Sequence, residues 1–282
     1  MRPLVISEFA PAKVNLALHV IGQRPDGYHL LDSLVVFAGI GDQVRVSPDD
    51  TLSLEVIGTE FEGVPSDDRN LILKAARLFD EKRGAKIVLE KNLPTASGIG
   101  GGSSDAAAAL RALAGLSKLP LPSTDNVLRL GADLPVCMKP EPQRMRGIGE
   151  ILDPAPALPR MHMVLANPRV GVTTPSVFGR MTNKINPPLE DIPDNMDAAQ
   201  FVHWLSRQRN DLEVPAISGL PVIQDVLNDL EDIPSCCLAR MSGSGATCFG
   251  LFETAAQARL AEDTLRAEHQ DWWVASGPIL LD

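Results

Sequence analysis

The segment 93–109 holds the residues whose types and spacing most clearly suggest chemistry. Glycines occupy positions 98, 100, 101 and 102, and serines follow at positions 103 and 104. Glycine lets the backbone approach a ligand closely, and a helix that begins after such a turn concentrates unpaired N–H groups and the positive end of its dipole. We expect Ser103 or Ser104 to cap that helix. The segment therefore predicts a cradle for phosphate oxygens rather than a flexible turn.

Two well-known phosphate-binding patterns do not match this segment. A Walker loop requires Gly-Lys followed by Ser or Thr, and a dinucleotide fingerprint requires glycine where Ser103 stands. A dinucleotide-dependent dehydrogenase is therefore the weakest function considered. The strings His-Arg-Asp and Asp-Phe-Gly of protein kinases do not occur in the chain.

Three further residues, Lys13, Asn15 and Asp133, are candidates for chemistry when taken together, whereas Lys13 and Asp133 taken singly are most often solvated surface charges or partners in a salt bridge. Lys13 and Asn15 lie two residues apart, which places them on the same face of a predicted strand. Asp133 lies on a predicted tight turn before a short apolar strand. A second Gly/Ser segment, 241–247, lies between two strand-like runs, and a hairpin turn and a ligand loop are equally good interpretations of it.

The composition limits the partners and the cellular compartment. The chain has 282 residues, a length that suits two modest domains, and its net charge of −10 argues against nucleic acid and anionic membranes as partners. It has no run of apolar residues long enough for a membrane span and no signal peptide, so we expect a cytoplasmic protein. The four cysteines show no metal-binding spacing, which predicts reduced thiols that mostly pack in the core.

The elements that must position these residues follow from hydrophobic periodicity. Strands are predicted at 13–21, 43–47, 52–57 and 85–90, a helix at 70–83 that ends at Gly84, and an Ala-rich helix from about 103 to 114. The proline-rich passage 153–159 predicts a domain boundary near residue 160, which gives domains 1–160 and 161–282. In the second domain, helices are predicted around 197–207, 221–230 and 254–268, and strands at 161–166, 236–241, 246–252 and 272–276. This alternation favours an open sheet with helices on one face. We expect the segment 183–194, with three prolines, to be an exposed and mobile connection.

Three sequence motifs, in order and spacing, resemble those of the GHMP kinases, which phosphorylate small molecules. They are Ala10-Pro-Ala-Lys-Val-Asn-Leu16, Ser97-Gly-Ile-Gly-Gly-Gly-Ser-Ser-Asp-Ala-Ala107 and Met241-Ser-Gly-Ser-Gly-Ala246. Three more stretches are similar to the branch of that superfamily that acts on a cytidine diphosphate-linked methylerythritol in the non-mevalonate isoprenoid pathway: 24–30, 131–135 and 146–151. The resemblance covers nearly the whole chain, with departures at 95–97 and 139–142.

The resemblance implies an α+β, two-domain GHMP kinase fold, with an N-terminal domain like ribosomal protein S5 and a C-terminal ferredoxin-like α/β domain. It implies transfer of the γ-phosphoryl group of ATP to the 2-hydroxyl of the methylerythritol unit, which yields the 2-phosphate and ADP. Mg²⁺ is expected with ATP, although no protein ligand for it can be named. No coiled-coil pattern is present, so we expect a monomer or a weak homodimer.

The same resemblance assigns roles to individual residues. It implies that Asp133 accepts the hydroxyl proton and that Lys13 stabilises developing negative charge, as the catalytic pair. It implies that the cytidine substrate is bound by Asn15, Tyr28, His29 and Phe178, with the cytosine between Tyr28 and Phe178 and its polar edge read by His29. It implies that ATP is bound by Asn70, Leu71, Lys91, Pro94, Ser97, Gly98, Ile99, Gly100, Gly101, Gly102, Ser103 and Ser104.

Three other functions remain open from the residues. Another GHMP kinase with a different acceptor is the nearest, since only the cytosine-pocket residues argue against it. A diphosphomevalonate decarboxylase belongs to the same superfamily. A non-catalytic nucleotide-binding module is the third, and the presence of both Lys13 and Asp133 disfavours it.

Overall fold

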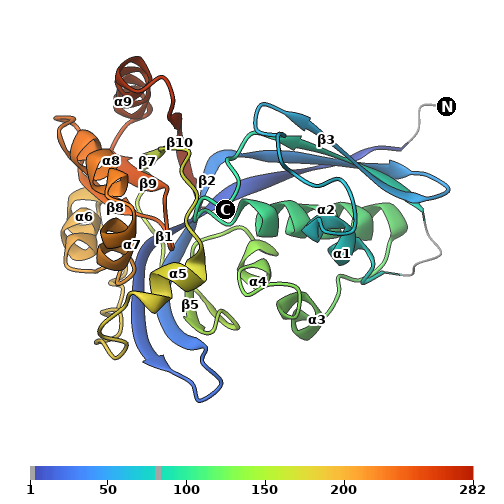
Figure 1. The fold of residues 1–282 in the computed structure, drawn as a ribbon, viewed down its shortest axis with the longest axis horizontal. Coiled ribbons are helices and arrows are strands. Elements are labelled where there is room, and N and C mark those ends of the chain that lie inside the picture. The colour runs from blue at the N-terminus through green and yellow to red at the C-terminus, as the bar shows by residue number, and fades with distance from the viewer. Residues whose placement is uncertain (1–3, 80–83, 282) are drawn as a thin grey trace. The chain divides into compact units, whose positions relative to one another are not determined.

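The structure, a computed structural model, describes residues 4–79 and 84–281, which form two compact units. The described residues of the first unit fall within 1–12, 41–95 and 100–139, and those of the second within 13–40, 96–99 and 140–282. Two long strands, β1 (Ile6–Gln23) and β2 (His29–Pro48), contribute residues to both units (Figure 1). The predicted boundary near residue 160 does not correspond to this interleaved division and stays a prediction.

The first unit packs helices against a small mixed sheet. Its middle strand, β4 (Ala85–Lys91), pairs in parallel with β3 (Leu52–Gly58) and antiparallel with residues 43–48 of β2. Helices α1 and α2 lie side by side (Figure 1), and the alanines of α2 allow this close packing. The elements of this unit are β3 (Leu52–Gly58), α1 (Leu71–Ala76), β4 (Ala85–Lys91), α2 (Gly101–Ser117), α3 (Thr124–Leu128) and α4 (Leu134–Cys137).

The second unit is built on antiparallel strands. In order across the sheet, β2 pairs with β10 (Trp273–Leu280), which pairs with β7 (His162–Asn167), then β9 (Cys248–Phe252) and β8 (Leu238–Met241). Residues 31–35 of β2 also pair with β5 (Gln143–Gly147), which pairs with β6 (Ile151–Pro154). The helices of this unit are α5 (Thr174–Gly179), α6 (Ala198–Ser206), α7 (Glu213–Gly219), α8 (Val222–Glu231) and α9 (Ala255–Glu268).

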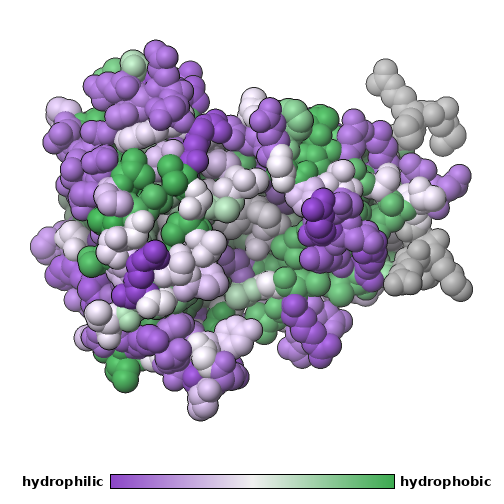
Figure 2. Space-filling view, in the orientation of Figure 1, coloured by the Kyte–Doolittle hydropathy of each residue, from purple (hydrophilic) through white to green (hydrophobic). Residues whose placement is uncertain are grey.

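Helix α9 shows how sequence periodicity fixes the packing of this unit. Ala258, Ala261 and Leu265 recur at helical spacing and are buried in the core with residues of β7, β9 and β10. The opposite face is polar, and the side of α9 in view in Figure 2 is mostly hydrophilic. Thr254 caps the helix in a capping box with Gln257.

The predicted strands and the three predicted helices of the second half are confirmed, as is the Ala-rich helix, which begins earlier and ends later than predicted. The α+β class is confirmed as well. Among the described residues, no helix is long and apolar enough to cross a membrane. All four cysteines are free thiols; Cys137 and Cys248 are buried, and Cys236 and Cys237 are partly buried.

Three local predictions are wrong. The predicted helix 70–83 ends at Ala76, because residues 77–79 tighten into turns that bring Phe79 onto the core; residues 80–83 lie outside the described part of the chain. The run after Asp133 is the short helix α4 and not a strand, since Pro135 in its first turn fixes a helical φ. Neither Ser103 nor Ser104 caps α2, because Gly100 at φ +62° is the N-cap and both serines lie inside the helix.

The segment 183–194 is largely exposed, as predicted, but it is anchored at several points. It has no regular secondary structure, but Asn186 donates its backbone N–H to the carbonyl of Val20, and Leu189 is buried. Hydrogen bonds to β1 and β2 fix it, and a composition rich in proline does not reveal such anchors.

Candidate functional site

Lys13 and Asn15 are brought together on β1 as the sequence predicts. The Nζ atom of Lys13 donates to Oδ1 of Asn15 at 2.9 Å, and both side chains are almost fully buried. Nδ2 of Asn15 donates to Oγ of Ser33 on β2 at 2.8 Å, and Ser33 donates to the carbonyl of Ala17 at 2.6 Å. Each polar atom of the Asn15 amide therefore has a defined partner, which fixes the orientation that it presents to Lys13.

The second Gly/Ser segment, 241–247, packs against the beginning of the glycine-rich segment. Oγ of Ser242 accepts a hydrogen bond from the backbone N of Asn15 at 3.1 Å and donates to the carbonyl of Gly98 at 3.2 Å. The N–H of Thr247 donates to the carbonyl of Ser97 at 3.1 Å, and the N–H of Lys13 donates to that of Ile99 at 2.9 Å. The segment connects β8 to β9, so it is a hairpin connection that also supports residues 97–99.

Gly98 is required by the close approach of these two segments. Its φ is +78°, and a Cβ atom there would lie 2.7 Å from the backbone oxygens of Ser242 and Gly245. Asn210, which the sequence analysis did not identify, donates from Nδ2 to the carbonyls of Met241 and Gly243 at 2.8 and 2.9 Å. No local sequence pattern signals this role, because Asn210 is far from both segments in the sequence.

Residues 100–104 belong to the first unit and form the start of α2. Gly100 adopts a left-handed conformation and has no side chain that could cap the helix. The first helical hydrogen bond runs from the N–H of Ser104 to the carbonyl of Gly100. The N–H groups of 101–103 therefore have no partner within the helix, which is the arrangement that binds phosphate oxygens. Ser103 is partly exposed here, and Ser104 is buried.

Beside this helix start lies an ion cluster formed by Asp42, Lys91 and Asp105. Nζ of Lys91 donates to Asp42 Oδ2 and, at 3.0 Å, to Asp105 Oδ2, and all three residues are at most 3% exposed. Burial alone would lower the pKa of Lys91, but the two carboxyl groups outweigh burial and raise that pKa. Lys91 is therefore an ammonium ion whose side chain connects the end of β4 to α2.

Two other predicted ATP-binding residues of the first unit have structural contacts. Oδ1 of Asn70 accepts the N–H of Ile72 at 2.9 Å and caps α1, and its Nδ2 donates to the carbonyl of Pro65 at 2.7 Å. Leu71 is the first residue of α1 and is partly buried.

Asp133, the predicted catalytic base, is partly buried at the N-cap position of α4, and its side chain does not cap that helix.

His29 and Phe178 form an aromatic stack in the second unit. Their ring centroids are 4.2 Å apart with an interplanar angle of 14°, and Tyr28 next to His29 is 59% exposed. Nε2 of His29 is buried with no hydrogen-bond partner among the described residues. Burial, and then the charge of Lys184, lowers the pKa of His29. The ring is therefore a neutral, flat surface that stacks on Phe178.

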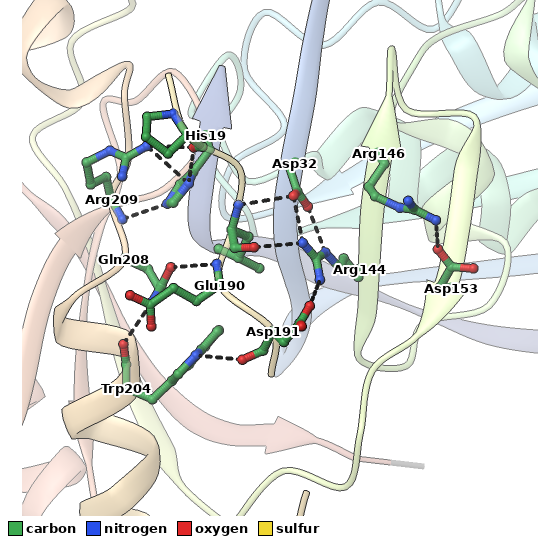
Figure 3. A network of polar contacts seen from close by, with 12 residues as sticks. His19, Asp32, Arg144, Arg146, Asp153, Glu190, Asp191, Trp204, Gln208 and Arg209 are labelled. Carbon is green, nitrogen blue, oxygen red and sulfur yellow. Dashed lines mark hydrogen bonds and ion pairs between the residues drawn. The ribbon is translucent and has the colours of Figure 1, made fainter. Parts of the chain in front are cut away.

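A polar network fixes the ends of β1 and β2 that carry these residues (Figure 3). Arg144 donates to both carboxylate oxygens of Asp32 at 2.9 and 2.8 Å, and both residues also bond to the backbone of Leu189. Nε2 of His19 accepts the backbone N–H of Arg209 at 3.0 Å, which leaves the proton of the neutral ring on Nδ1, 3.1 Å from a carbonyl oxygen of the segment 183–194. Burial, and then Arg209, lowers the pKa of His19. These contacts anchor the segment beside the strands of the site.

Two segments of the chain match models of known domains. Residues 70–142 match the GHMP kinases N terminal domain, and residues 189–271 match the GHMP kinases C terminal domain. Full-length relatives are more specific. A protein of Ruegeria pomeroyi named 4-diphosphocytidyl-2-C-methyl-D-erythritol kinase is 55% identical, and the match covers 98% of this chain and all of the relative. Relatives with the same name in Dinoroseobacter shibae and Paracoccus denitrificans are 56% and 52% identical, with 96% and 98% of this chain and 93% and 98% of the relatives covered.

The chain belongs to the 4-diphosphocytidyl-2-C-methyl-D-erythritol kinase family. A crystal structure of 4-(cytidine 5'-diphospho)-2C-methyl-D-erythritol kinase matches it with a TM-score of 0.81 at 33% identity, over 97% of this chain and 99% of the other. The predicted two-domain GHMP kinase fold is thereby confirmed. A homoserine kinase from Cytophaga hutchinsonii (TM-score 0.66) and the L. major mevalonate kinase (0.63), at 16% and 14% identity, share only the fold.

Several of the predicted site residues of this kinase family member lie together in the structure. The structure brings Lys13 and Asn15 together, supports 97–99 by the 241–247 segment, and stacks His29 on Phe178. The sequence analysis missed Ser33, Ser242 and Asn210 in the second unit, and Asp42 and Asp105 in the first. Ser242 lies in the motif 241–246, which signals a loop at this place, although not the contacts of Ser242 with Asn15 and Gly98. No sequence pattern signals the role of Asp42.

The described residues of this family member provide no cage for a metal ion. Within 4–79 and 84–281, no group of three or more His, Cys, Asp and Glu side chains is arranged to hold one. Mg²⁺ that arrives with ATP is held mainly by the phosphates and by one or two carboxylates, so the Mg²⁺ expected with ATP stays a prediction.

Proposed function

We propose that the protein transfers the γ-phosphoryl group of ATP to the 2-hydroxyl of 4-diphosphocytidyl-2-C-methyl-D-erythritol, which yields the 2-phosphate and ADP in the non-mevalonate isoprenoid pathway. The observation that carries this proposal is the full-length identity of 50–56% to relatives that bear the name of that kinase. Because the reaction consumes ATP, a cytoplasmic location is part of the proposal, as is a monomer or weak homodimer.

The chemistry assigned to the site is general-base catalysis of phosphoryl transfer. Asp133 accepts the proton of the acceptor hydroxyl, so that the oxygen attacks the γ-phosphorus as ADP leaves. Lys13 stabilises the negative charge that develops on the transferred group, and Asn15 orients the acceptor. The short hydrogen bonds from Lys13 to Asn15 and from Asn15 to Ser33 support this role, because they hold the amide and the ammonium in one orientation.

The binding of the two nucleotides rests on two features. The unpartnered N–H groups of 101–103 and the glycine-supported residues 97–99 suit the phosphates of ATP, and the contacts of Asn70, Leu71, Lys91 and Pro94 with the adenosine stay predictions. The stack of His29 on Phe178 shows that a face of Phe178 accepts a flat ring at 4.2 Å. Cytosine is such a ring, and its placement between Tyr28 and Phe178 requires His29 to turn aside from that face.

The decisive experiment measures ADP formation from Mg-ATP with each of four acceptors: 4-diphosphocytidyl-2-C-methyl-D-erythritol, mevalonate, homoserine and galactose. We expect turnover with the cytidine substrate alone, and Asp133→Asn to lower kcat by about 10²–10⁴-fold, because the base is removed while the shape is kept. Asp125→Asn, which makes the same change on an exposed residue of α3, is the matched control and should retain full activity.

Each other outcome has a defined meaning. Turnover with a different acceptor would reject the cytosine pocket and retain the kinase. Full activity of Asp133→Asn would reject Asp133 as the base. ATP binding without turnover on any acceptor would favour a nucleotide-binding module.

A further inference from the structure

The ion cluster of Asp42, Lys91 and Asp105 holds two carboxyl groups and one ammonium group in a buried place. Oδ1 of Asp42 accepts the backbone N–H groups of Asn92 and Leu93 at 2.5 and 2.8 Å, and its Oδ2 accepts Lys91. These three donors satisfy the carboxyl group of Asp42. Asp42 and Lys91 are therefore a complete ion pair without Asp105.

Asp105 has a very different environment. Oδ2 accepts Lys91 at 3.0 Å, but Oδ1 is buried with no hydrogen-bond partner among the described residues. Nζ of Lys91 donates to both carboxyl groups, so Asp105 and Asp42 share one cationic partner and lie together in the cluster. A buried carboxylate with an unpartnered oxygen beside a second carboxylate is strongly disfavoured relative to the neutral acid.

The cluster also lies against the start of α2. A Cβ atom on Gly101 would be 3.1 Å from Nζ of Lys91, and Asp105 is four residues further along the helix, about 6 Å along its axis. An ionised Asp105 would give the cluster a net charge of −1 at the helix end where phosphates are proposed to bind. At an effective dielectric constant near 20, one such charge weakens the binding of an anion by about tenfold or more.

We infer that Asp105 carries a neutral carboxyl group and acts as a positioning residue, which holds the first turns of α2 in place for the phosphates of ATP without adding negative charge. The inference rests on the proposed kinase function. Asp105 contacts Lys91, which also contacts Asp42, so the influence of Asp105 on ATP passes through Lys91 and the helix start.

The direction of the pKa of Asp105 agrees with this geometry. Burial raises it well above its ordinary value, Lys91 opposes the rise, and Asp42 adds to it. Of the described elements packed on α2, β1 brings Glu8, whose carboxylate accepts a hydrogen bond from Nε of Arg111 at 2.9 Å and does not join the cluster. The buried residues of α1 are apolar and its Lys74 is exposed, and α4 contributes buried apolar residues and the Cys137 thiol.

The test uses the full chain and the non-hydrolysable analogue AMPPNP, so it does not depend on the acceptor. Asp105→Asn keeps the shape and supplies a permanent N–H donor in place of the acid proton, whereas Asp105→Leu removes every hydrogen bond. We expect Asn to change the Kd for AMPPNP by less than about threefold and Leu to weaken it by about tenfold or more. The infrared spectrum should show the carbonyl band of a protonated carboxyl group in the wild type, and this band should be absent from Asp105→Asn.

The pH dependence of stability is a second readout. As pH rises above about 4, the unfolded chain loses the Asp105 proton while the folded chain keeps it, so the contribution of Asp105 to the free energy of unfolding falls with rising pH. Asp105→Asn lacks this loss. Its Tm relative to the wild type should therefore increase from about pH 4 towards neutral pH.

These measurements also separate the two proposals. A wild-type spectrum without the protonated carboxyl band, or an Asp105→Asn variant that binds AMPPNP tenfold more tightly, would overturn the inference. Equal AMPPNP binding by the Leu variant would reject the positioning role. A wild type that shows the band but binds no AMPPNP would contradict both the kinase function and the positioning role that rests on it, and would leave only the neutral carboxyl group established.

Discussion

The two parts of the glycine-rich segment are held by different kinds of contact. Residues 97–99 are held by backbone groups, by the hydroxyl of Ser242 and by the close approach of glycines. The start of α2 lies against the ion cluster of Asp42, Lys91 and Asp105. Neutral hydrogen bonds are insensitive to pH, whereas a buried ion cluster depends on the protonation and completeness of its members. Substitutions should therefore affect the two parts in different ways.

The largest effect is expected where an essential charge of the ion cluster is removed. Asp42→Asn leaves the buried Lys91 with Asp105 alone, which must then ionise to compensate it. We expect a loss of about 3–5 kcal/mol in the free energy of unfolding, measured by urea denaturation at pH 7. Asp50→Asn, on an exposed residue of the same unit, should change it by less than about 0.5 kcal/mol. A loss below 1 kcal/mol for Asp42→Asn would show that the cluster does not depend on this charge.

A smaller effect is expected at residues 97–99, which are held by hydrogen bonds between neutral groups. Ser242→Ala removes the hydroxyl that accepts the backbone N–H of Asn15 and donates to the carbonyl of Gly98, so both backbone groups lose a hydrogen-bond partner. We expect a loss of about 1–3 kcal/mol that is the same at pH 6 and pH 8. Ser176→Ala removes an exposed hydroxyl that donates to the carbonyl of Thr173, and should cost less than about 0.5 kcal/mol. A strong pH dependence for Ser242→Ala would contradict the distinction between the two parts.

The smallest effect should come from an exposed ion pair near the buried one. Arg45 and Glu90 pair across β2 and β4 with side chains 44% and 37% exposed. Arg45→Gln should lower the free energy of unfolding by about 0.2–1 kcal/mol, and 1 M NaCl should abolish the difference. A loss as large as that of Asp42→Asn would mean that burial is not what distinguishes the ion cluster.

Much of the fold was predictable because local patterns decide it. The alternation in 43–47 and the helical spacing in 254–268 each match one face of a buried element. The prediction was wrong where tertiary packing outweighed local pattern. Phe79, for example, turns onto the core and shortens α1. The segment 183–194 is largely exposed as predicted, but hydrogen bonds to other strands anchor it.

The site was predictable only in its motifs. The glycines at 98 and 100–102 and the pair Lys13 and Asn15 carry local signals. Ser242, by contrast, is 227 positions from Asn15 in the sequence, and Asp42 is 49 positions from Lys91. Contacts of that separation depend on strand pairing, and a single sequence does not reveal them. The role of Lys91 in binding ATP stays a prediction beside its observed place in the ion cluster.

The interleaving of the two units has a consequence for synthesis on the ribosome. The first unit has all of its residues once position 139 has been made, whereas residues 13–40 of the second unit still lack their partners. Ala38 pairs with Ile279, and Leu18 and Val20 join a core that includes Val274. Since chains emerge from the N-terminus, the strand that carries Lys13 and Asn15 is synthesised among the first elements and completed among the last. During that interval its apolar side chains are the natural substrate for chaperones.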